Sequence, residues 1–276
     1  MIRVQRHRIK PYAVGCGLDY SLKSLEARRS AAFRSASNLS MRMRSAMDVG
    51  IVACMEAPKS VHLKAFHEAA QAGAALFAFA NGYRGELPVG DQRLKFVEPP
   101  DESHIHTGKW ETAFYLNLLC RDSNGLNLLC EVPVDLLRKS STTGPEYSFK
   151  LVDALKAVWK TDPRAVSILT EAMLAATSVD SDFTIYLDSH RMALIGLAGD
   201  SDFEELLANG LKDHKEYWTA SKDRRIDPHG FVSIPLCAIA AFAYDNHVPF
   251  QLDSEYLPMR LVDGSFLKTE QTGDSI

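Results

Sequence analysis

The chain has 276 residues, of which 46% are hydrophobic and 24% are charged, and its formal net charge is −4. This composition is ordinary for a globular protein and excludes general disorder, and a chain of this length can bury a large core. Residues 1–47 carry ten Lys and Arg and two acidic residues, whereas the rest of the chain carries 21 basic and 33 acidic residues. The sequence therefore predicts a basic N-terminal arm on an acidic body.

The cysteines and the absence of long apolar segments indicate the compartment. An odd number of scattered cysteines favours reduced thiols in the core over a disulfide framework; they are Cys16, Cys54, Cys120, Cys130 and Cys237. The N-terminus lacks the apolar run of a secretory signal, and no later segment reaches membrane-spanning length. We expect a cytoplasmic protein with no membrane contact.

The N-terminal third begins with an irregular segment and continues with helices. Residues 1–17 show no sustained periodicity, so we predict a basic, loosely ordered leader there. Nucleic-acid or membrane contact is one reading of the basic arm, but its Arg residues are interleaved with Ser and Ala rather than with aromatic residues, which favours a solvated helix face. Helical periodicity follows over 19–37 and 39–55, and Pro58 opens a longer helix that ends at Asn81-Gly82.

The middle of the chain contains the one strand signal. Residues 85–97 alternate apolar and polar side chains around Gly90-Asp91, which predicts a small β-hairpin. A helix resumes near Thr107 with aromatic residues at four-residue spacing on one side. The segment 140–147 is the most linker-like piece of the chain. We favour an exposed loop within a single helical domain of residues 18–276, and a boundary between two domains is the alternative.

The C-terminal half is predicted to be helical and to contain the central element of the fold. Helices are expected at 146–160, 163–177 and 182–197, and Ser201 with Glu204 forms a capping box for the helix that ends at Trp218.

The segment 234–244 has no charged side chain, so a helix built from it has no face suited to water and is buried on all sides. Ser233 is its predicted N-cap, and Pro235 lies in its first turn. The expected fold is all-α, with about ten helices and one hairpin. The predicted core residues are Trp110, Phe114, Trp218, Phe231, Ala240, Tyr244 and Tyr256.

Motifs that carry chemistry are absent from the sequence. There is no zinc-protease His-Glu-x-x-His, no Cys-x-x-Cys, no nucleophile elbow and no phosphate-binding loop. His104 and His106 form a candidate metal pair without an obvious third ligand. Cys54 and Cys237 lie in apolar runs, which is the wrong setting for a reactive thiol. We therefore expect no cofactor, no metal and no enzymatic activity.

Four segments occur in an order that carries a resemblance. They are FHEAAQAGAALFAFA (66–80), KWETAFYLNLLCRD (109–122), FEELLANGLKDHKEYW (203–218) and GFVSIPLCAIAAFAYDNHVPFQLDSEYLP (230–258). This set resembles the immunity protein 49 family, and the similarity extends over about residues 18–261.

The resemblance implies a protein partner. A member of this kind binds a cognate polymorphic toxin, of the class delivered by type VI secretion in interbacterial competition, and so protects the producing cell and its sisters. A helical-repeat-like adaptor that binds other protein partners is the alternative, and an adjacent reading frame that encodes a large secreted toxin would distinguish the two.

The candidate partner-binding residues are acids around the start of the helix 201–218, namely Asp180, Asp182, Asp188, Asp200, Asp202, Glu204 and Glu205. Acids in a first turn complement the helix dipole, which is one explanation for them. The other is an acidic surface that docks a basic toxin such as a nuclease domain, because a nuclease is basic where it binds phosphate. Direct nucleic-acid binding by this chain is not expected.

Overall fold

The structure, a computed structural model, describes residues 2–8, 17–56, 60–142, 144–176, 189, 191–197 and 202–268. These residues are predominantly helical and include two short pairs of strands, which confirms the predicted all-α class with its hairpin. The described chain holds 13 α-helices, more than predicted, because several have only one turn and show no periodicity in the sequence. None of these helices is long and apolar enough to cross a bilayer.

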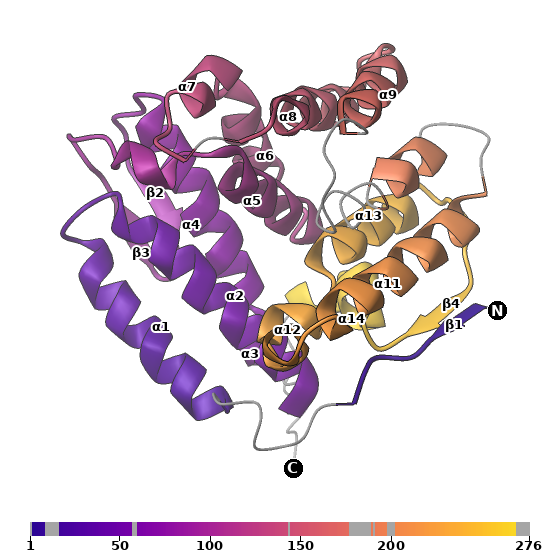
Figure 1. The fold of residues 1–276 in the computed structure, drawn as a ribbon. Helices are drawn as coiled ribbons and strands as arrows, with labels where there is room; N and C mark the ends of the chain where they lie inside the picture. Colours follow the sequence, from indigo (N-terminus) through magenta and orange to yellow (C-terminus); the bar gives the residue numbers. More distant parts are fainter. Residues whose placement is uncertain are drawn as a thin grey trace.

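Four helices of the N-terminal half lie side by side. α1 (Leu18–Ala32) packs on α2 (Asn38–Glu56), α2 packs on α4 (Ala65–Ala80), and α4 packs on α5 (Thr107–Leu119). Figure 1 shows them together on one side of the molecule. The shorter elements around them are α3 (Ser60–Leu63), a 3-10 turn at Glu102–His104 and α6 (Ser123–Glu131).

The helix predicted from Pro58 to Asn81 is divided. Lys64 separates α3 from α4, and Pro58 lies outside the described residues.

The C-terminal half supplies the helices on the other side of α5 (Figure 1). After α7 (Val134–Arg138), α8 (Glu146–Trp159) packs on both α5 and α9 (Ala165–Ala176). The remaining elements are helical residues 191–197, α11 (Phe203–Thr219), α12 (Lys222–Ile226), a 3-10 turn at Pro228–Gly230, α13 (Ile234–Asp245), α14 (Met259–Val262) and a 3-10 turn at Ser265–Leu267. The packing of α8 on α5 joins elements on either side of the loop 140–147, and the single-domain organisation stays a prediction.

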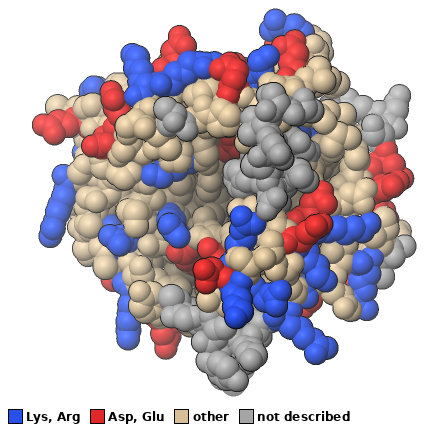
Figure 2. All heavy atoms as spheres, viewed as in Figure 1, with Lys and Arg blue, Asp and Glu red and all other residues tan. Residues whose placement is uncertain are grey.

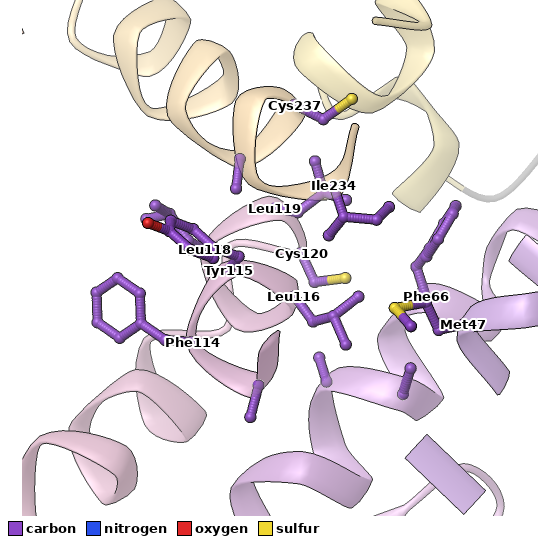
Figure 3. Packing of buried hydrophobic residues seen from close by; sticks show 14 of the residues in the cluster. Met47, Phe66, Phe114, Tyr115, Leu116, Leu118, Leu119, Cys120, Ile234 and Cys237 are labelled. Carbon is purple, nitrogen blue, oxygen red and sulfur yellow. The ribbon is translucent and has the colours of Figure 1, made fainter. Parts of the chain in front are cut away.

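α13 packs lengthwise on α5 in the interior of the molecule, as expected for a helix without a polar face. Its alanines Ala238, Ala240, Ala241 and Ala243 are fully buried, and their small side chains allow close approach of neighbouring helices. Figure 3 shows Ile234 of α13 and Cys120, the residue that follows α5, directed toward Phe66, whereas Tyr115 points to the opposite side of α5. The core therefore continues from α13 through α5 to α4.

Most of the predicted core residues are buried. Trp110, Phe114, Phe231, Ala240 and Tyr256 are at most 2% exposed, while Trp218 is half-buried.

The prediction that Tyr244 belongs to the core is wrong, because this residue is 47% exposed. The last turn of α13 leaves the core, and Asp245 beside it forms an ion pair with Arg121 at 3.0 Å near the surface.

The N-terminal residues are docked, so the predicted loose leader is wrong for residues 2–8. β1 (Ile2–Val4) pairs in parallel with β4 (Leu252–Ser254), and Figure 1 shows the two strands side by side. The buried His7 ring lies 2.8 Å from the Tyr256 hydroxyl. Local patterns could not show this, because the partners are 249 residues apart in sequence. Residues 9–16 lie outside the described residues.

The hairpin is anchored by a buried arginine. β2 (Leu87–Val89) and β3 (Gln92–Leu94) are antiparallel, and Gly90 adopts the positive φ of 58° that this tight turn requires. Arg42 of α2 is fully buried and donates from Nη2 to the Val89 carbonyl at 2.7 Å and from Nε to a Glu68 carboxylate oxygen at 2.9 Å. The hairpin is thereby held against α2 and α4.

Candidate functional site

The predicted acidic cluster is described only at the start of α11. Asp202, rather than Ser201, is the N-cap, because its carboxylate accepts a hydrogen bond from the Glu205 backbone N–H. Glu204 accepts a hydrogen bond from the Gln251 N–H at 2.7 Å, so this acid fixes a distant loop. Glu205 is exposed. Ser201 and the other four acids, Asp180, Asp182, Asp188 and Asp200, lie outside the described residues.

An apolar groove adjoins this end of α11. The groove, of about 810 Å³, is lined by Tyr244, Asp245, His247, Val248, Pro249, Phe250, Gln251, Leu252 and Met259. We call it the C-terminal groove. Tyr244 and Met259 are 47% and 49% exposed, and together they give the groove an exposed apolar surface. The Phe250 ring meets Phe203 of α11 edge to face, with centroids 5.6 Å apart, so the groove is continuous with the acidic helix start.

A second concave feature lies at the centre of the molecule. This central cavity has a volume of about 390 Å³ and lies between α2, α5, the start of α8 and the start of α13. Figure 2 shows the corresponding face hollowed near its centre, with charged residues distributed around it. Met47, Tyr147 and Trp218 contribute apolar and aromatic surface to its wall, and Glu111, Thr112 and His229 contribute polar groups.

Glu111 is the acid in the wall of the central cavity. Its side chain is 8% exposed, and burial raises the pKa of its carboxyl to about 7, although the charge of Arg191 acts in the opposite direction. Among the residues that the structure describes, none forms a hydrogen bond to this carboxyl, and burial and the charge of Arg191 are the only influences on its pKa. Near neutral pH, Glu111 is therefore divided between its protonated and ionised forms.

His229 carries a positive charge on the opposite wall. Its Nδ1 lies 2.8 Å from Asp227 and its Nε2 lies 3.1 Å from Asp48. Burial disfavours the charged imidazole, but the two carboxylates outweigh it and raise the pKa of His229 to about 9. The imidazolium is therefore held between two carboxylates, and the Arg44 guanidinium also acts on Asp227.

The cysteine thiols in the described part of the chain are unsuited to nucleophilic chemistry. Cys54, Cys120, Cys130 and Cys237 are unpaired, and burial raises the pKa of each thiol. For Cys54 the pKa reaches about 12.

The candidate histidine metal pair gains no further ligand. His104 lies 3.0 Å from the Lys109 ammonium, and burial lowers the pKa of His104 and of His106. Within the described ranges, no group of three or more potential metal ligands comes together.

Sequence reasoning missed Glu111 and the His229 cluster. Glu111 had a detectable signal, because it is the only acid in KWETAFYLNLL, a segment whose other side chains are mostly apolar. The His229 cluster had none, since Asp48 and Asp227 come from segments far apart in the chain.

Comparison with known proteins identifies the family. A search of curated proteins and a search of solved structures found no significant match. The sequence model of the family described as Immunity protein 49 matches residues 55–261, which is more than half of the 276 residues. This range includes α4, α5, α8, α11 and α13 and the C-terminal groove, whereas α2, which also lines the central cavity, lies almost wholly before it. The chain therefore belongs to the immunity protein 49 family.

Proposed function

We propose that this protein binds a cognate secreted antibacterial toxin and neutralises it, so that the producing cell and its sisters survive. The observation that carries the proposal is the family match over residues 55–261. The concave sites agree with a binding role, because neither combines a reactive thiol with a base or a metal-ligand cluster among the described residues.

The C-terminal groove and the start of α11 are the proposed docking surface. Protein interfaces are enriched in exposed aromatic and Met side chains at their centre and are polar at their rim. Tyr244 and Met259 supply such a centre, and Glu205 lies on the adjoining helix start. A basic toxin surface, such as that of a nuclease domain, would complement this acidic rim.

Co-expression tests the function. The toxin encoded by an adjacent reading frame is expressed in bacteria with and without this chain, and we expect growth only when the chain is present. Purified toxin and this chain should also form a complex on size-exclusion chromatography. Continued growth arrest in the presence of well-folded protein, or no complex, would reject neutralisation by direct binding and favour an adaptor role.

Variants of the groove test the docking surface. Truncation of interface anchors costs about 2 kcal/mol or more, so the double variant Tyr244→Ala/Met259→Ala should weaken toxin binding by about 30-fold. Val97→Ala is the matched control, because Val97 is 78% exposed and lies in the loop after β3, away from the groove. Equal affinities of the double variant, the control and the parent would exclude the groove from the interface.

The acidic rim is tested by its effect on the association rate. Glu205→Lys should slow association at low salt and reduce its dependence on ionic strength, because rim charges steer the encounter of two proteins. Glu205 is the suitable position, since Asp202 caps α11 and Glu204 holds the Gln251 loop. Unchanged association kinetics would show that this acid does not face the toxin.

A further inference from the structure

The central cavity has the dimensions of a small-molecule site. Its volume of about 390 Å³ falls within the range of about 300–1,000 Å³ that is typical of ligand pockets. Its wall combines the apolar side chain of Met47 with the aromatic rings of Tyr147 and Trp218. Such a wall can enclose an apolar or aromatic body with little need for hydrogen bonds.

The described wall also carries polar side chains, and Glu111 is the one carboxylic acid among them. The Glu111 carboxyl lines the cavity although its side chain is 8% exposed, and no described residue forms a hydrogen bond with it. A buried carboxyl without a hydrogen bond is costly, so one that persists at a cavity wall is well placed to meet a donor from a ligand.

The surrounding charges favour a cation over an anion as that ligand. His106 also lines the cavity, and burial lowers the pKa of its imidazole, so the ring is neutral at pH 7. His229 is charged, but Asp48 and Asp227, which are not among the described lining residues, contact it and offset its charge. Among the described residues, the other titratable members of the wall are Tyr115 and Tyr147. The Arg191 guanidinium stacks over the Tyr147 ring at 4.6 Å but is not itself among the described lining residues.

We propose that the central cavity binds a small organic cation, an amine or amidine on an aromatic or alkyl body, with the cationic head on the Glu111 carboxylate and the body against Met47 and Tyr147. This site is distinct from the C-terminal groove and goes beyond toxin neutralisation. Each of the two proposals can fail without the other, because this site is tested on the isolated protein.

Tryptamine and tryptophol are suitable probes, because they share an indole body and differ in an ammonium or a hydroxyl group. The protein is labelled with [¹³C]methyl methionine and titrated at pH 8. We expect the Met47 methyl signal to shift, while that of Met259, which lies in the other site, stays in place. A charged hydrogen bond predicts that tryptamine binds about tenfold more tightly than tryptophol.

Two variants and one control locate the contact. Glu111→Gln preserves the shape of the side chain and should bring the two probes to within about twofold of each other. Thr112→Phe should weaken both probes by filling the cavity from its half-buried rim. Glu131→Gln, at an exposed acid on α6, is the control and should behave as the parent.

The affinity should also depend on pH. Tryptamine, as an aliphatic amine, stays protonated throughout this range, so the titration of Glu111 decides how tightly it binds. In the parent, tryptamine should bind roughly tenfold more tightly at pH 8 than at pH 6. In Glu111→Gln, the affinity for tryptamine should be the same at both pH values. The proposal is overturned if neither probe shifts Met47 at millimolar concentration, or if the preference for tryptamine survives in Glu111→Gln.

Discussion

Two carboxylates in this protein are almost equally buried and have opposite electrostatic character. Glu68 is 5% exposed and accepts hydrogen bonds from Arg42 at 2.9 Å and from Arg29 at 3.0 Å. Burial alone would raise the pKa of Glu68, but the two guanidinium groups outweigh it and lower the pKa. Glu111 is 8% exposed, accepts no hydrogen bond from a described residue and has a pKa raised to about 7. The partners, rather than the depth of burial, decide the state of each acid.

The difference separates a structural role from a binding role. Glu68 joins α1, α2 and α4, and Arg42 extends this network to the hairpin through the Val89 carbonyl. Both carboxylate oxygens of Glu68 therefore already accept hydrogen bonds from arginines within the protein. The Glu111 carboxyl contributes nothing comparable to packing and faces a cavity, so it is available for a ligand.

The largest expected effect comes from breaking the Glu68 network. Glu68→Gln leaves the Arg42 guanidinium fully buried without its counter-ion, which should lower the free energy of unfolding by about 3–5 kcal/mol. Urea denaturation measures this change. Glu26→Gln, which removes the exposed partner of Arg29, is the control and should change the stability little. A small loss in Glu68→Gln would mean that the network is not needed for the fold.

Glu111→Gln is expected to stabilise the protein at pH 8. An acid with a raised folded pKa binds its proton more tightly in the native state, so the free energy of unfolding falls as pH rises from about 4.3 to about 7. Removing the acid should recover up to about 3 kcal/mol above pH 7 and nothing below pH 4.

Urea denaturation of the parent and Glu111→Gln at pH 4 and pH 8 measures this difference. The comparison has to be made variant against parent, because His214 acts in the opposite sense. Burial lowers the pKa of His214 to about 3, so its contribution to stability is lost as pH falls below about 6.5. A variant that is less stable than the parent at pH 8 would show that Glu111 has a stabilising partner.

The smallest effect on stability is expected at Glu146, an acid whose ion pair lies at the surface. It forms a two-pronged pair with Arg138 at 2.7 and 2.8 Å, but the two side chains are 58% and 42% exposed. Glu146→Gln should therefore lower the free energy of unfolding by only ~0.2–1 kcal/mol, less at high salt. Thermal melts at two salt concentrations test this expectation. A loss as large as that of Glu68→Gln would show that hydrogen-bond geometry matters more than burial.

The sequence predicted those features whose cause is local. The uncharged run 234–244 indicated a buried helix because no face of it suits water, and Gly90-Asp91 indicated the hairpin because few residues tolerate its turn. The same local reasoning placed the N-cap of α11 at Ser201, one residue before Asp202, because both residue types cap helices.

The candidate sites could not be predicted in the same way, because each depends on residues that meet only in the fold. Nothing near Glu111 in sequence indicates that the cavity wall also contains Met47 and His229. Similarly, Glu204 was predicted only as a surface acid or helix cap, and its bond to the Gln251 N–H depends on a loop 47 residues away. Burial and hydrogen-bond partners are tertiary properties, and they determine which acids are free to bind.

The pairing of β1 with β4 has a consequence for synthesis on the ribosome. Residues 2–4 are made first, but their partners at 252–254 follow about 250 residues later, which at ordinary translation rates takes tens of seconds. The helices α1, α2, α4 and α5 can pack on one another during this interval, because each contacts its neighbour in sequence order. The N-terminal strand can pair only after this interval, so the contact between the two ends of the described chain has to form later in synthesis than the contacts among these helices can.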